Sequence, residues 1–340
     1  MAVFLSSSPW IALAWVTVKA LLVAGAILTG AALYLTALRK TLGYFTYRLG
    51  PTRVGPWGLF QVIADAVKMM IKEDILPEKA DKAVFRLAPI IFMFTAVSAM
   101  AIIPWGPSDS VFASYVADPN AGILVFLALG AISVYGVALG GWASQNKYSL
   151  MGSLRSTAQM ISYELAMGMA VIGIIIATGS TRLTDIVNAQ HAWPFIAPQI
   201  LGFIVYYISA LAETSHVPFD LPEAESELVG GYFTEYAGMR FGLYFLGELV
   251  AQLVQACLIS LLFLGGWNVP FFLAWIPGIA VIPATLWFVL KVCFVIFTFL
   301  WIRATMPRMR YDRLMSFGWK FLLPVSALNL IIQAVWVALF

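Results

Sequence analysis

Apolar stretches of roughly 20 residues recur along the whole chain, and each is long enough to cross a bilayer as a helix. The chain is 61% hydrophobic and 11% charged, and its longest polar interruption is about 45 residues, so no separate soluble domain is visible. The sequence therefore predicts an all-α polytopic membrane protein in which residues 1–340 form a single membrane domain. The eight predicted spans are approximately residues 11–37, 84–104, 121–142, 158–178, 194–212, 238–264, 280–302 and 321–339.

The cysteines, the net charge and the N-terminus exclude several classes of protein. Cys257 and Cys293 lie within apolar runs, and two such cysteines give neither a metal-site spacing nor a disulfide framework. The net charge of +3 gives no sign of a nucleic-acid surface. No basic region precedes the first apolar run and no cleavage site follows closely, so residues 1–38 are predicted to be a retained span and not a signal peptide.

Basic residues are unevenly distributed between successive loops. The first, third, fifth and seventh loops hold eight, two, zero and five Lys or Arg residues, whereas the opposite loops hold only Arg182. The positive-inside rule therefore places the odd-numbered loops in the cytoplasm and both termini on the other side of the membrane.

The first cytoplasmic loop, 39–83, contains a predicted amphipathic helix at 58–73. Its length and its charged residues argue against a span, so we expect it to lie along the membrane surface with its apolar stripe inward. It could simply anchor the loop, or it could border the entrance for a lipid-like molecule. The apolar residues at helical spacing are Leu59, Ile63, Ala66, Val67 and Met70.

The loop at 213–237 is strongly acidic. Six of the seventeen carboxylates in the chain lie between Glu213 and Glu235, without one Lys or Arg. Crowded carboxylates repel one another, so some should hold protons near neutral pH and be able to exchange them. A solvated acidic loop is the alternative. Asp220, Pro222 and Glu223 also form a helix-start signal within the loop.

Charged residues inside predicted spans are the other candidates for a functional site. Such residues are costly at membrane depth and are functional candidates by default. Any one of them could be a structural contact between helices, but together they indicate a proton relay whose pKa values are set by burial and by neighbouring charges. They are Lys19, Glu164, Glu213, Glu248 and Lys291.

A basic stretch completes the seventh span and continues into the last cytoplasmic loop. It holds Arg303, Arg308, Arg310 and Arg313. These arginines could help to set the orientation of the chain in the membrane and could contact lipid headgroups. They could also pair with the acidic loop or dock a soluble partner.

Four segments carry a resemblance to a known family: GYFTYRLGPTRVGPWGLFQVIADAVKMMIKED, GWASQNKYSLMGSLRSTAQMISYE, PFDLPEAESELVGGYFTEY and WIRATMPRMRYDRLMSFGWK. In this order they resemble the H-type membrane subunit of respiratory complex I, the proton-pumping NADH:quinone oxidoreductase, whose mitochondrial counterpart is NADH dehydrogenase subunit 1. The resemblance covers nearly the whole chain. It implies a multi-pass subunit of a bacterial inner membrane that forms the membrane end of a quinone chamber and couples quinone reduction to proton translocation.

The resemblance also implies roles for residues and partners. The chain would bind no cofactor of its own and would take quinone as a substrate. Iron–sulfur clusters and FMN would be held by partner subunits. The partners would be the soluble quinone-site and terminal iron–sulfur subunits, small membrane subunits and lipid. The residues implied near the quinone chamber are Arg39, Asp65, Lys68 and Arg303. Those expected in proton coupling are Glu164, Glu213, Glu223, Glu225, Glu227, Glu248 and Lys291.

One position departs from the family pattern. A glutamate usually precedes the Arg-Arg or Arg-Lys pair at the end of the first span, but here the stretch reads LTALRK, with Leu38 in its place. Arg39 must therefore find another partner, and the acidic loop is one candidate. The departure leaves open two other identities for the chain. It could be the equivalent subunit of a membrane-bound hydrogenase, or of a complex I paralogue with another electron donor. A stand-alone transporter is a further alternative, although the chain has no convincing internal repeat.

Overall fold

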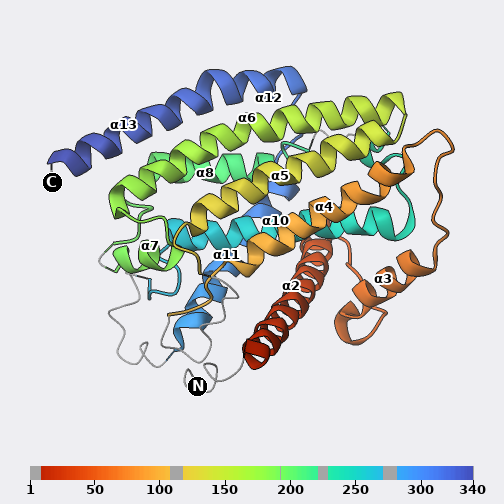
Figure 1. The fold of residues 1–340 in the computed structure, drawn as a ribbon, viewed down its shortest axis with the longest axis horizontal. Helices are drawn as coiled ribbons and strands as arrows, with labels where there is room; N and C mark the ends of the chain where they lie inside the picture. The colour runs from red at the N-terminus through yellow and green to blue at the C-terminus, as the bar shows by residue number, and fades with distance from the viewer. Residues whose placement is uncertain (1–8, 108–117, 192, 221–228, 271–281, 340) are drawn as a thin grey trace.

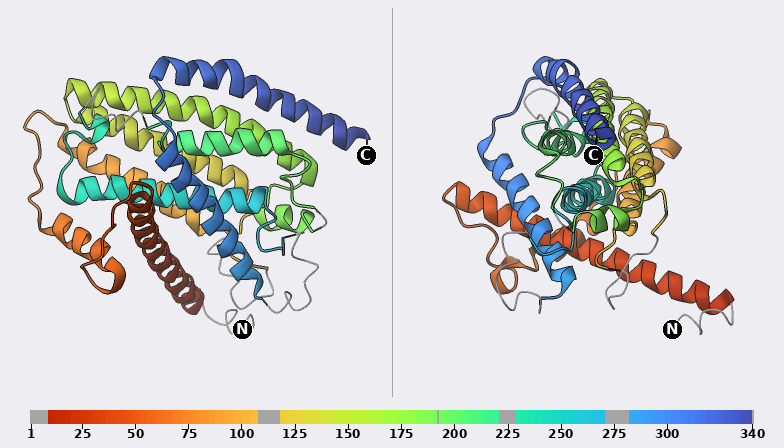
Figure 2. Two further views of the ribbon diagram at one scale, coloured as in Figure 1. Left: turned by 180° about the vertical axis from the view of Figure 1, so that it is seen from behind. Right: turned by 90° about the vertical axis from the view of Figure 1, so that its left-hand side faces the viewer.

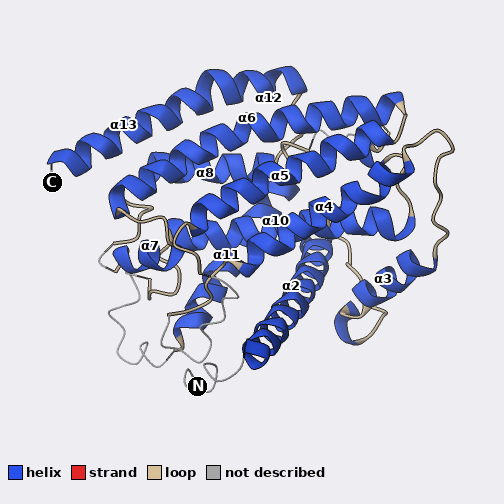
Figure 3. Ribbon diagram, in the orientation of Figure 1, coloured by secondary structure: helices blue, strands red, loops and turns tan. Residues whose placement is uncertain are grey.

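The computed structural model describes residues 9–107, 118–191, 193–220, 229–270 and 282–339, and all regular structure within these residues is helical (Figure 3). This confirms the predicted all-α class. The longer helices are α2 (Pro9–Phe45), α3 (Gln61–Ile71), α4 (Lys82–Ala101), α5 (Gly122–Ala143), α6 (Lys147–Thr178), α7 (Leu183–Ala189), α8 (Ile200–Glu213), α10 (Gly238–Leu262), α11 (Ala284–Thr305), α12 (Tyr311–Phe317) and α13 (Leu323–Leu339).

Within the described residues, seven helical runs are long and apolar enough to cross a membrane. They are α2, α4, α5, α6, α10, α11 and the run Tyr311–Leu339, in which a π-helical turn, Gly318–Leu322, joins α12 to α13. The chain is therefore a polytopic membrane protein. The predicted amphipathic helix is confirmed as α3, which is shorter than the predicted 58–73.

The fifth predicted span, 194–212, differs from the prediction. Only its second part is helical, because α8 begins at Ile200 and covers 14 residues. Such a helix is about 21 Å long and falls short of the roughly 30 Å of a hydrocarbon core. Pro194 and Pro198 lie in the non-helical part, and each lacks the backbone N–H that a continued helix would need. The helix therefore starts late and ends inside the bundle.

The spanning helices form a layered bundle. α4 packs on α5 and α10, α5 packs on α6, and α6 packs on α8 and α13 (Figure 1). α2 crosses this stack at a steep angle and contacts α4, α10 and α11 (Figure 2). α3 lies beside the bundle, at the end where α4 begins (Figure 1).

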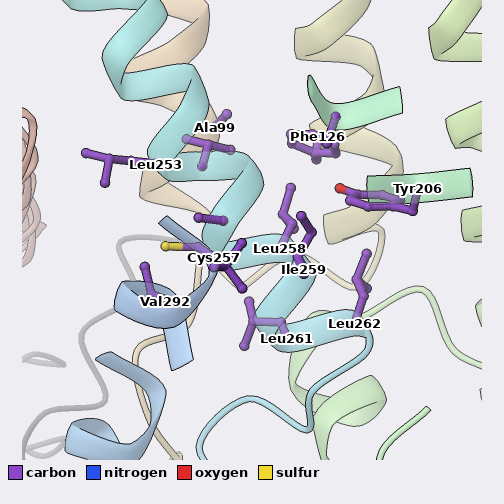
Figure 4. Close-up of a cluster of buried hydrophobic side chains, with 14 of the residues drawn as sticks. Ala99, Phe126, Tyr206, Leu253, Cys257, Leu258, Ile259, Leu261, Leu262 and Val292 are labelled. Atoms are coloured by element: carbon purple, nitrogen blue, oxygen red, sulfur yellow. The ribbon is translucent and has the colours of Figure 1, made fainter. Parts of the chain in front are cut away.

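α10 is the central helix of the bundle. In the most apolar 18-residue stretch of α10, 78% of the residues are buried, compared with 22–50% in the corresponding stretches of the other spanning helices. Its side chains are surrounded by residues of α4, α5, α8 and α11, so it is the element against which the others are positioned (Figure 4). The buried side chains labelled there include Ala99, Phe126, Tyr206, Leu258, Ile259 and Val292.

Two glycines let α4 approach α5 and α10 closely. A Cβ on Gly136 of α5 would lie 2.9 Å from Cβ of Phe92, and a Cβ on Gly247 of α10 would lie 2.6 Å from Cδ1 of the same phenylalanine. Small residues at helix contacts are the usual means of close packing in membranes. Phe92 of α4 is thereby fixed between the two helices.

α3 is attached to the bundle by two ion pairs. Arg39 of α2 donates a charged hydrogen bond to Asp65 in the middle of α3. Just after α3, Asp74 forms an ion pair with Arg240 at the start of α10, with 2.8 Å between Nη2 and Oδ2. These contacts leave the predicted apolar stripe exposed, and Ile63 is 60% accessible.

Candidate functional site

A cavity lies among α4, α5, α8 and α10 and has a volume of about 50 Å³. One water needs roughly 10–15 Å³ of such space, so the cavity has room for several waters. Its lining is mainly apolar and includes Thr95 and Ser133, which lie near the middles of α4 and α5. The cavity therefore lies near mid-depth in the bundle, and it contains the carboxylates of Glu213 and Glu248.

Glu213 enters the cavity because α8 is short. It is the last residue of that helix, so the early end of α8 brings its carboxylate into the bundle interior. Nε2 of Gln255 on α10 donates to Oε2 of Glu213 at 2.6 Å. The hydroxyl of Tyr206 donates in turn to Oε1 of Gln255 at 3.0 Å. These two bonds fix the direction of the amide and hold one oxygen of the carboxylate.

Glu248 projects from α10 and is bonded by the far end of the acidic loop. The hydroxyl of Tyr232 donates to Oε1 of Glu248 at 2.9 Å. Tyr232 is buried in the short 3₁₀ helix Gly231–Phe233, and its ring packs edge-on against Tyr244 of α10. Both ends of the 213–237 loop therefore contribute a side chain to the same cavity.

Backbone carbonyls at the end of α8 and in the loop that follows it are satisfied by side chains of α6. Nε2 of Gln159 donates to the carbonyls of Ala212 and Phe219, at 2.8 Å each. The hydroxyl of Ser149 donates to the carbonyl of Tyr232 at 3.2 Å. Irregular backbone inside a membrane needs such partners, and here side chains of α6 supply them.

Glu164 approaches the same region from α6 and is half-buried. A Cβ on Gly130 of α5 would lie 3.2 Å from Oε1 of Glu213 and 3.7 Å from Oε1 of Glu164. Oxygens of the two carboxylates therefore border the same small space beside Gly130. The structure thus brings together three of the predicted residues, Glu164, Glu213 and Glu248.

The remaining predicted coupling residues lie elsewhere. Glu223, Glu225 and Glu227, with the helix start predicted there, fall outside the described residues. Lys291 of α11 lies outside the cavity lining. Its ammonium donates to three backbone carbonyls beyond the end of α10, at 2.7–2.8 Å, and this is the arrangement of a structural cap. The three acceptors belong to Leu264, Gly266 and Asn268.

The residues predicted near a quinone chamber lie around α2, α3 and the end of α11. Burial raises the pKa of Asp65, but hydrogen bonds from Arg39 and Gln61 outweigh it and hold that pKa below its ordinary value. The described partner of Arg39 is thus on α3, and Leu38 is buried in the hydrophobic core. Lys68 is exposed on α3.

Arg303, at the end of α11, lies near His216 of the acidic loop. Burial and then the charge of Arg303 lower the pKa of His216 to about 4, so this histidine is neutral near pH 7. The prediction that the basic stretch pairs with the acidic loop is confirmed by another pair. Nη2 of Arg308 lies 3.2 Å from Oδ2 of the buried Asp220.

Three residues of the site did not stand out in the sequence. Gln255 could have been found, because Glu248, Gln252 and Gln255 follow a four- and three-residue spacing and form a polar stripe on an otherwise apolar helix. Tyr232 and Gly130 carried no such signal. Among the described residues, no group of three or more His, Cys, Asp or Glu side chains could hold a metal ion.

The bundle and its cavity define a polytopic membrane protein with hydrogen-bonded carboxylates in its interior, a class suited to proton transfer across a membrane. The chain belongs to the NADH dehydrogenase family, whose family model matches residues 18–334.

Curated relatives cover nearly the whole chain, and each is named as an H-type subunit of NADH-quinone oxidoreductase. One from Symbiobacterium thermophilum is 54% identical over 330 residues, covering 97% of this chain and 98% of its own length. One from Brevibacillus brevis is 47% identical and covers 98% of this chain and 97% of its own. A third, from Syntrophotalea carbinolica, is also 47% identical, with 94% of this chain and 96% of its own length aligned.

Proposed function

We propose that this chain is the membrane subunit of an NADH-quinone oxidoreductase that forms the membrane end of the quinone chamber and couples quinone reduction to proton translocation. The observation that carries the proposal is the cavity at mid-depth, in which Glu213 and Glu248 are each bonded by a neutral donor, Gln255 and Tyr232. A carboxylate held in this way can take up and release protons without leaving its place.

The quinone chamber would lie where α2, α3 and α11 meet, around Arg39, Asp65, Lys68 and Arg303. Arg39 and Asp65 hold α3 to α2, and the exposed apolar stripe of α3 offers a surface for an isoprenoid tail. Quinone is the substrate. FMN and iron–sulfur clusters would lie in soluble partner subunits and deliver the electrons, so this chain would perform no redox step alone.

The proposed setting is the inner membrane of a bacterium, with both termini on the non-cytoplasmic side. The distribution of Lys and Arg among the loops supports this orientation. The C-terminal end of α13 also lies at the same end of the bundle as α7 (Figure 1). α7 belongs to the connection between α6 and α8, which the proposed orientation places on the outer side. Small membrane subunits and lipid would cover the exposed apolar faces.

The test is a charge-neutralising substitution in the assembled complex. Glu213→Gln keeps the shape of the side chain and removes its ability to carry a proton, so proton translocation in membrane vesicles should fall while the complex still assembles. Glu235→Gln is the matched control, because Glu235 belongs to the same loop but accepts a hydrogen bond from Asn146 outside the cavity, at 2.5 Å. Normal quinone turnover with wild-type proton translocation in Glu213→Gln would refute the proposal.

A further inference from the structure

Gly130 of α5 differs from the glycines at close helix contacts. Within 4 Å of the position of a Cβ on this residue, the neighbouring atoms are two carboxylate oxygens, Oε1 of Glu213 and Oε1 of Glu164. By contrast, a Cβ on Gly136 or Gly247 would collide with Phe92, which is the ordinary reason for glycine at a helix contact.

Glycine in the middle of a helix lowers the stability of that helix, so its presence there calls for a structural or functional reason. Relative to alanine the cost is about 1 kcal/mol. Gly130 has an ordinary helical position in α5, and its carbonyl accepts the hydroxyl of Ser133 at 2.6 Å. Neither a left-handed backbone nor close helix packing accounts for the missing side chain. The space that it leaves is bounded by the two glutamates.

We propose that the absence of a side chain at Gly130 keeps open the space through which Glu213 and Glu164 exchange a proton, which makes Gly130 a positioning residue for the transfer. This inference rests on the proposed function. Oε1 of Glu213 and Oε1 of Glu164 lie 3.2 and 3.7 Å from the position of a Cβ on Gly130, so they are close enough to each other for water beside Gly130 to connect them.

The transfer is balanced within this pair. The carboxylic acid of one glutamate gives its proton to the bridging water, and the water gives another of its protons to the carboxylate of the second. One O–H bond breaks and one forms at each step, and the water is unchanged. A methyl group on Gly130 would take up part of the space beside the two oxygens and can neither donate nor accept a proton, so it would hinder this exchange.

The hydrogen bonds of Glu213 leave the required oxygen available for this exchange. Gln255 bonds to Oε2, whereas Oε1 is the oxygen nearest Gly130. The amide thus orients the carboxylate so that its other oxygen faces Glu164. Glu213 and Glu164 come from α8 and α6, which pack on each other, and Gly130 of α5 lies beside both carboxylates.

The experiment compares three variants in the complete complex. Gly130→Ala adds the methyl group, and Gly130→Ser adds the same Cβ with a hydroxyl that can bond to both carboxylates and relay the proton. Gly168→Ala is the control, because it is one turn beyond Glu164 on α6 and its Cβ would meet nothing within 4 Å. The readouts are proton translocation per quinone reduced and the amount of assembled complex.

We expect Gly130→Ala to lower proton translocation about tenfold, less than the roughly 10²–10⁴-fold contribution of a positioned proton-transfer group, because both carboxylates remain. Gly130→Ser should recover most of the loss, and Gly168→Ala should match the wild type. Equal losses in the Ala and Ser variants would overturn the inference, since they share the Cβ and the defect would then be one of packing.

Glu213→Gln and Glu164→Gln separate this inference from the proposed function. If both lose proton translocation while Gly130→Ala behaves as the wild type, the proposed function stands and the role of Gly130 is wrong. If both glutamate variants translocate protons normally, the proposed function itself fails, and the inference fails with it.

Discussion

The amide of Gln255 donates to Oε2 of Glu213 at 2.6 Å and so connects the middle of α10 to the last residue of α8. Because the same amide accepts the hydroxyl of Tyr206 at 3.0 Å, its oxygen and nitrogen cannot exchange places without losing both bonds. A neutral side chain thereby fixes the orientation of a buried carboxylate. Gln255 is therefore part of the structure that positions Glu213 in the cavity.

Replacing Gln255 should therefore impair proton coupling. Gln255→Leu removes the donor to Glu213 and the acceptor of Tyr206, and a buried polar group left without its hydrogen bond costs about 1–3 kcal/mol. We expect proton translocation in vesicles to fall. The control is Gln252→Leu, one turn earlier, which loses a bond to Tyr34 at 2.6 Å but leaves Glu213 untouched. Equal effects of the two substitutions would show that only the stability of α10 is at issue.

The pair between Arg308 and Asp220 should contribute to stability. Asp220 is 2% exposed and Arg308 is 48% exposed, so Arg308→Gln should destabilise the complex by about 1–3 kcal/mol after allowance for solvent screening. Arg310 and Asp312 are both exposed, and Arg310→Gln should cost about 0–1 kcal/mol. The measurement is the temperature at which the purified complex loses activity. A larger drop for Arg310→Gln would contradict the assignment.

The stability of the complex should fall in acid because of His216. Its pKa is about 4 in the fold, against an ordinary 6.5, so between these values the unfolded chain binds a proton that the folded chain does not. The folded state is therefore destabilised as pH falls through this range, by on the order of 3 kcal/mol in total. Arg303 opposes the protonated form, and the Val217 carbonyl favours it.

The measurement is the half-life of heat inactivation at about pH 7.5 and about pH 5, which bracket the ordinary histidine pKa. His216→Gln cannot titrate, so it should lose less stability between the two conditions than the wild type. The same pH dependence in both proteins would exclude this histidine as the cause.

The apolar stripe of α3 should matter most for long-tailed quinones. Ile63→Lys places a charge on that stripe and should cost roughly a few kcal/mol of apolar contact at most. We expect a larger loss of activity with a long-tailed quinone than with a short-tailed analogue. Ala64→Lys is the control, one residue further along and off the stripe. An equal loss with both quinones in Ile63→Lys would mean that α3 only anchors the loop.

The sequence predicted the spans because their apolar runs are long enough to cross a bilayer, and it predicted α3 because its apolar residues follow a helical period. It predicted too long a helix at 194–212. Hydropathy averages over a window and does not register that Pro194 and Pro198 prevent a helix there. Charges stood out in apolar runs, so Glu164, Glu213 and Glu248 were all found. Gly130 was not, because a missing side chain is visible only when its neighbours are known.

The hydrogen-bond partners of Lys291 and Tyr232 could not be predicted from the sequence either. Lys291 stood out as an intramembrane charge, yet its described partners are backbone carbonyls, which every residue has and no pattern marks. Tyr232 lies in a loop without periodicity, and its bond to Glu248 depends on how that loop folds back into the bundle. Both sets of hydrogen bonds depend on how the non-helical backbone runs through the folded bundle.

The short length of α8 has a consequence for how the protein is made. A 14-residue helix that ends in a carboxylate is too short to settle in a bilayer on its own as it leaves the ribosome. The backbone that follows it is also irregular and would expose unpaired polar groups to lipid until α6 and α10 enclose it. Insertion of α8 therefore has to be cooperative with α10, which is synthesised after it, and the cavity comes into existence only when that later helix is in place.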